Sequence, residues 1–75
     1  MNYAECERLV RKMASGKTYS LSVNTIEIPG VGMSRDFTIV ILYCDRAEDN
    51  TTGRGYTWDD AYQMALRDAK MKGNL

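Results

Sequence analysis

The chain of 75 residues contains no histidine, and this absence removes several kinds of chemistry. Histidine is the usual general base, the usual partner of a cysteine or serine nucleophile, and the commonest zinc ligand. Hydrolytic triads of the ordinary kinds are therefore excluded. We expect a protein that is not an enzyme, with no catalytic residue, no cofactor, no metal site and no small-molecule substrate.

Cysteine is also scarce, because the chain has only Cys6 and Cys44. Two cysteines are too few for a disulfide framework in a chain that shows no export signal, and neither has a neighbouring cysteine at the spacing of a metal site. Cysteine is among the residue types most often buried. We therefore expect both to be free thiols that pack against apolar side chains.

Net charge and long apolar runs are missing as well. The 10 basic and 10 acidic side chains cancel, so no overall field draws the chain to nucleic acid, to an anionic membrane or to an acidic substrate. No run approaches the length that spans a membrane, and the opening MNYAECERLV has two acids before its first base and no apolar segment typical of an export signal. We expect a cytoplasmic protein.

The length predicts a single domain, residues 1–75. A chain of this size builds a core of only marginal stability, which staples or oligomerisation often reinforce. The length also argues against a large buried active-site cleft.

Two segments have the periodicity of amphipathic helices. In residues 3–14 apolar side chains recur at three- and four-residue steps, and the Ser15-Gly16 pair supplies a stop. The second helix begins at Thr57, an N-cap residue that has Asp60 three positions later as in a capping box. Its apolar stripe consists of Trp58, Ala61, Tyr62, Ala65, Leu66 and Ala69.

Two strands are predicted between the helices, at residues 18–28 and 37–44, with residues 29–36 as a hairpin loop. Residues 45–56 are polar and contain glycine, and they are predicted to form a connection with at most one short irregular strand. The order is helix, strand, strand, helix. It predicts an α+β fold in which both helices lie on one face of an antiparallel hairpin.

The first strand changes phase along its length. Its apolar positions run through Tyr19, Leu21 and Val23 and then move by one residue to Ile26 and Ile28. An extra residue near residues 24–25 restores the alternation, because a β-bulge places two residues of one strand opposite one residue of its partner. The pattern therefore predicts a bulge there, with Val23 opposite Ile41.

The stretch GRGYTWDD, residues 53–60, has the composition of a phosphate-binding loop that leads into a helix. Gly53 and Gly55 would supply free backbone amides for an anion. However, Asp59 and Asp60 lie in the first turn of the helix, where they repel an anion, and the lysine of a P-loop is missing. We interpret this stretch as a turn and a helix start that bind no small molecule.

The second strand has an apolar character on both faces. The face turned away from the predicted helices carries Thr38, Val40, Leu42 and Cys44. A two-stranded sheet is also marginal alone and leaves two open edges. These features favour a partner, either a second copy of the chain or a larger protein. The alternative is that residues 45–56 fold over this face and cover it.

We therefore predict a small non-enzymatic protein-interaction module that binds a larger host protein or forms a homodimer. Surface apolar side chains without a role in a monomer mark the expected contact sites. The predicted partner-binding residues are Val40, Leu42 and Cys44 on the second strand, Val31 and Met33 in the hairpin loop, and Met64 and Met71 on the second helix.

An alternative function is nucleic-acid binding through a local basic cluster at the first helix. The cluster consists of Arg8, Arg11, Lys12 and Lys17. Such side chains bind phosphates, and their binding weakens steeply as salt rises, whereas an apolar protein contact does not weaken in this way.

The segment Gly-Arg-Gly-Tyr-Thr-Trp-Asp-Asp-Ala after a hairpin resembles the close of small phage and prophage accessory or inhibitor proteins. Those proteins act by occupying a surface of a larger host machine, so this resemblance implies an inhibitor or accessory role. The element order is also similar to a double-stranded RNA-binding domain that lacks a strand. That family has a lysine cluster at the start of its last helix, where this chain has Asp59 and Asp60, so the resemblance implies the fold and not the RNA site.

Overall fold

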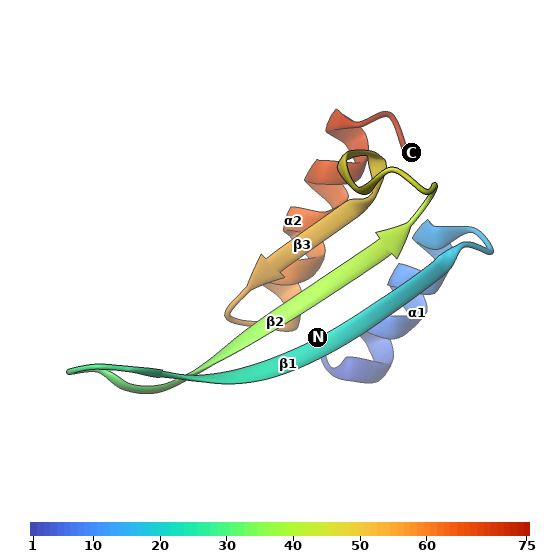
Figure 1. The fold of residues 1–75 in the computed structure, drawn as a ribbon. Coiled ribbons are helices and arrows are strands. Elements are labelled where there is room, and N and C mark those ends of the chain that lie inside the picture. The colour runs from blue at the N-terminus through green and yellow to red at the C-terminus, as the bar shows by residue number, and fades with distance from the viewer.

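The computed structural model describes all of residues 1–75. Its elements in chain order are α1 (Tyr3–Ala14), β1 (Thr18–Ile28), β2 (Gly32–Leu42), the short 3-10 helix η1 (Ala47–Asp49), β3 (Thr51–Gly55) and α2 (Trp58–Met71). The three strands form one antiparallel sheet in the order β1-β2-β3, and both helices lie on the same face of it (Figure 1). The predicted α+β class and the placement of the helices are confirmed. Neither helix is long and apolar enough to cross a membrane.

Both helices begin and end where their local signals predict. The Asn2 side chain accepts a hydrogen bond from the Glu5 amide at 2.9 Å and caps α1, while Ser15 ends the helix in the left-handed conformation. The Thr57 hydroxyl accepts from the Asp60 amide at 3.1 Å and caps α2. Each cap satisfies an amide that has no partner within its own helix.

The β1–β2 hairpin is longer and more regular than predicted. Its loop contains only Pro29, Gly30 and Val31, and β2 begins at Gly32 rather than at residue 37. The Val31 amide donates to the Ile28 carbonyl at 3.0 Å, and Gly30 has a φ of 81°. Proline in the second position and a glycine with positive φ in the third are the pattern of a type II turn.

The predicted bulge near residues 24–25 is wrong. Every residue from Thr18 to Ile28 has a single partner on β2, so Val23 lies opposite Phe37 and not opposite Ile41. The phase change of the sequence instead places Ile26 on the sheet face opposite the helices, because the pleat continues without interruption. The physical reason is that helix packing covers only the half of β1 near Thr18 (Figure 1), and every residue from Ser22 to Glu27 is exposed, so no core has to be preserved there.

The core lies between the sheet and the two helices. Its buried side chains are Cys6, Val10, Met13 and Ala14 of α1, Ile39 and Ile41 of β2, and Trp58, Ala61, Ala65 and Ala69 of α2. Trp58 closes one end of this core through edge-on contacts, with its ring centroid 5.6 Å from that of Tyr3 and 4.8 Å from that of Phe37. One core therefore joins both helices to the central strand.

Candidate functional site

The face of the sheet opposite the helices, here called the outer face, is covered by no other element (Figure 1). Ile39 and Ile41 of β2 point into the core with no exposed surface, so their neighbours along the strand point to the outer face. The strand registers place the following residues there: Thr18, Ser20, Ser22, Asn24, Ile26 and Ile28 of β1, Ser34, Asp36, Thr38, Val40 and Leu42 of β2, and Thr52 and Arg54 of β3. Most of these side chains are polar, which suits a surface open to water.

The outer face nevertheless carries two apolar side chains in its central strand. Val40 is half-buried among its polar neighbours, and Leu42 is 45% exposed. The idea that residues 45–56 fold over this face is wrong. They form η1 and then β3, which pairs with the free edge of β2. These residues therefore widen the sheet and do not cover its outer face.

One ion pair crosses the outer face near the end of β3. Arg54 donates to the Asp36 carboxylate at 2.6 Å, and this bond raises the pKa of the guanidinium. The sequence analysis did not predict this pair. The pair follows from register, because Arg54 lies opposite Thr38, one diagonal step from Asp36 on the same face.

Beyond this ion pair the hairpin projects from the body of the protein as a two-stranded arm. β3 ends at Gly55, opposite Phe37, so residues 24–36 have no third strand beside them and extend past both helices (Figure 1). We call residues 24–36 the arm. The predicted contact residues Val31 and Met33 lie near its tip and are 78% and 68% exposed.

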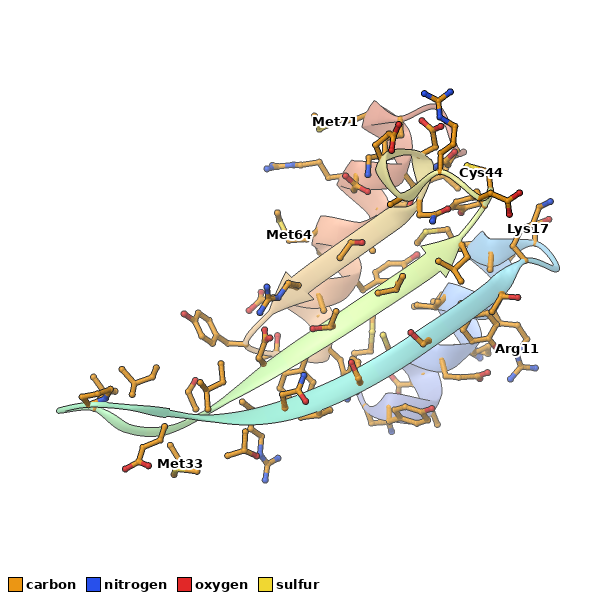
Figure 2. The ribbon with its side chains drawn as sticks, viewed as in Figure 1. Arg11, Lys17, Met33, Cys44, Met64 and Met71 are labelled. Atoms are coloured by element: carbon orange, nitrogen blue, oxygen red, sulfur yellow. The ribbon has the colours of Figure 1, made fainter.

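The predicted partner-binding residues fall in separate places rather than on one surface (Figure 2). Val40 and Met33 are seven positions apart on one strand, which corresponds to roughly 23 Å at about 3.3 Å per residue. Met64 and Met71 are exposed on α2, on the helix side of the sheet, beside the basic side chains of Arg67 and Lys70. The structure therefore separates an outer-face site, an arm site and an α2 site.

The two cysteines differ in their surroundings. Cys6 is buried in the core, and burial raises the pKa of its thiol, as expected for a packing residue. Cys44 lies beyond the end of β2 and is exposed, with Sγ 3.5 Å from the Arg46 carbonyl oxygen. The prediction that Cys44 packs against apolar side chains is wrong because the strand ends at Leu42. Both thiols are free.

The predicted basic cluster is only partly available for an anion. Arg11 forms an ion pair with Glu7 at 2.5 Å, and the Tyr19 hydroxyl donates to the same carboxylate at 2.6 Å. These two bonds lower the pKa of Glu7. Arg8, Lys12 and Lys17 are exposed and have no carboxylate within 4.0 Å.

The two glycines of GRGYTWDD lie in β3 and not in a turn. A Cβ atom on Gly53 would overlap backbone atoms of Ala61 and Ala65, and one on Gly55 would overlap Asp60. These glycines therefore allow β3 to lie directly against α2. The sequence analysis missed this role, although glycines at alternate positions, so that both face one side of a strand, are a readable signal.

One of the two first-turn acids of α2 forms an ion pair with the N-terminus. Asp59 accepts from the N-terminal ammonium group of Met1 at 3.1 Å. No group of three or more histidine, cysteine, aspartate or glutamate side chains is placed to hold a metal ion.

Comparison of the chain with protein-family models, with curated proteins and with solved structures finds no match.

Proposed function

We propose that this protein is a small non-enzymatic interaction module of the cytoplasm that docks on a larger protein through its outer face. The observation that carries the proposal is that Val40 and Leu42 stand in the central strand of a sheet face that no part of the chain covers. Burial of such side chains against a partner is favourable at about 25 cal/mol per Å². The surrounding serine and threonine hydroxyls can donate to or accept from a partner at the rim.

The resemblance to small phage accessory and inhibitor proteins supports the same proposal, since those proteins occupy a surface of a larger machine. The arm adds a second point of contact, because it projects beyond the body (Figure 1) and its apolar side chains Val31 and Met33 are exposed. A neutral chain gains little from long-range attraction, so shape and apolar contact would determine which partner it selects.

The experiment is a pull-down from host lysate, after nuclease treatment, with the tagged wild-type chain and two variants. Leu42→Glu places a charge on the outer face, whereas Gln63→Glu places the same charge on the exposed surface of α2 and serves as the matched control. We expect a protein partner that the wild type and Gln63→Glu retain and Leu42→Glu loses. A partner that Leu42→Glu retains would contradict the proposal.

Nucleic-acid binding is a second candidate function. The observation that favours it is that Arg8, Lys12 and Lys17 have no carboxylate partner and remain free to bind phosphates. The third strand also gives the element order of a double-stranded RNA-binding domain, although Asp59 and Asp60 still stand where that family has lysines. If this function holds, the logarithm of the binding constant should fall by about 0.9 per phosphate contact for each tenfold rise in salt.

A further inference from the structure

The edge of β1 that points away from β2 makes no hydrogen bond within the chain. β1 pairs with β2 on one side only, and outside that ladder its backbone makes a single bond, from the Val31 amide to the Ile28 carbonyl in the turn. No side chain bonds to its backbone either. In an edge strand alternate residues point their N–H and C=O groups away from the sheet, so a row of unpaired groups runs along β1.

The opposite edge of the sheet is partly occupied by α2. The Thr52 amide of β3 donates to the Asp68 carboxylate of α2 at 3.1 Å. Just before β3, the Lys72 ammonium donates to the Asn50 carbonyl oxygen at 2.6 Å and the Asn74 side-chain amide donates to the Asp49 carbonyl oxygen at 2.9 Å. β1 is therefore the longer and less occupied of the two edge strands.

The sequence of β1 has few of the features that protect an edge. Natural edge strands are blocked by proline, by charged side chains and above all lysine, by bulges or by shortness. Residues 18–28 contain no proline and no basic residue, keep a regular register over 11 residues, and carry a single charge, at Glu27. A strand of this length and composition is a template for pairing.

We infer that a second copy of this chain occupies the β1 edge, so that two β1 strands pair antiparallel about a two-fold axis through Val23. Val23 is the middle residue of Thr18–Ile28, and only this register pairs the whole strand with its copy. The result is a continuous six-stranded sheet with an isologous interface. This inference does not rest on the proposed docking of the outer face, because the edge and the outer face are different surfaces.

In this register the half of β1 that has a helix behind it pairs with the half of the other β1 that has none. α1 lies behind the half of β1 near Thr18, whereas the half that belongs to the arm has no helix behind it (Figure 1). The two-fold axis brings the bare half of each strand beside the covered half of the other. Val23, which is 45% exposed in the single chain, then faces its own copy at the centre.

Charges are complementary in the same register. Glu27 lies opposite Tyr19 of the partner subunit, and Lys17 of the partner subunit lies two residues before that tyrosine, in the turn that leads into β1. Diagonal neighbours across two strands lie about 7–8 Å apart between Cα atoms, which long side chains can bridge. Neither Glu27 nor Lys17 has an ion pair within the single chain. The two-fold axis of the dimer forms this Glu27–Lys17 pair twice.

The test is the mass of the full chain by sedimentation over a range of concentrations, with folding of each variant checked by circular dichroism. The wild type should form a dimer. Val23→Lys places like charges face to face at the axis and should raise the dimer Kd by roughly tenfold or more. Val23 is half-exposed, so the fold should tolerate the change. A chain that stays monomeric at its highest soluble concentration would overturn the inference.

A charge exchange tests the register itself. Lys17→Glu and Glu27→Lys should each weaken the dimer by roughly tenfold, because each turns two attractions into repulsions. The double variant should regain the wild-type Kd. Arg67→Glu, an exposed base on α2, is the control and should leave the Kd unchanged. Failure of the double variant to recover would refute this register, and a dimer broken by Leu42→Glu but not by Val23→Lys would place the contact on the outer face instead.

Discussion

At the scale of single residues, the contact between β3 and α2 depends on the small size of the residues where the two elements meet. Gly53 and Gly55 face Ala61 and Ala65, and these are the two smallest residue types. Close approach of backbones brings the Ala61 and Ala65 methyl groups into the core without a gap. It also explains why β3 lies against α2 although it is only five residues long.

Gly53→Ala should therefore destabilise the protein. The new methyl group meets backbone atoms of Ala61 and Ala65, which cannot rotate away as a side chain can. Overpacking of this kind costs about 1–3 kcal/mol, and we expect a value near the upper end, measured as a fall in the free energy of unfolding in urea. Thr52→Ala, an exposed neighbour in the same strand, is the control and should change stability by less than about 0.5 kcal/mol. Equal stability of Gly53→Ala and the wild type would show that the helix can move aside.

The lowered pKa of Glu7 predicts that the stability of the folded protein depends on pH. Bonds from Arg11 and Tyr19 lower its pKa in the folded protein below the ordinary value of 4.5. The unfolded chain therefore takes up the proton first, and the contribution of Glu7 to stability is complete above that value and is lost as the pH falls through the lower folded-state pKa. Glu7→Gln should be less stable than the wild type at pH 7, and the difference should vanish in acid. A gap for Glu7→Gln that persists in acid would contradict the assignment.

At the scale of elements, the helices are determined locally and the hairpin is not. Caps at Asn2 and Thr57 and a stop at Ser15 are visible in the sequence because each is a bond between residues a few positions apart. The register of β1 and β2 depends instead on what lies behind each part of the strands. Past Val23 no helix lies there, so no apolar face had to be preserved and no bulge formed.

Thr57→Ala should lower the free energy of unfolding by about 1 kcal/mol, because the Asp60 amide loses its acceptor. Thermal unfolding followed by circular dichroism measures the change. Thr57→Ser keeps the hydroxyl oxygen and should stay within about 0.5 kcal/mol of the wild type. Equal losses for both variants would mean that the threonine methyl group, and not the cap, stabilises α2.

At the scale of the whole molecule, the fold is 39 Å in its longest dimension and 17 Å in its shortest. The helices and the core occupy one end, and the arm extends from the other (Figure 1). One core therefore stabilises a molecule that has an uncovered sheet face, an open strand edge and a projecting hairpin. Contact with other molecules can use each of these surfaces without disturbing the core.

A shortened arm tests this separation. Replacing residues 27–33 with Asn-Gly joins the strands through a tight turn that suits a two-residue hairpin. The core residues all lie outside the removed segment, so the monomer should keep its fold and its melting temperature at concentrations below dimer formation. The shortened chain should also form the β1-paired dimer less tightly, since the pairs of Glu27 and Ile28 with Tyr19 and Thr18 of the partner subunit are removed. Loss of the folded monomer would show that the arm supports the core.

The sequence by itself determined the two helices, their caps, the hairpin and the α+β class, because these follow from periodicity and from bonds between near neighbours in the chain. Only the tertiary structure decided the register without a bulge, the strand made from Thr51–Gly55, the exposure of Cys44 and the separation of the predicted contact residues into three sites. Each of these depends on which segments lie side by side in space. A pattern along one strand records that a side chain is apolar, but the neighbour that covers it, or the lack of one, is set by residues distant in the chain.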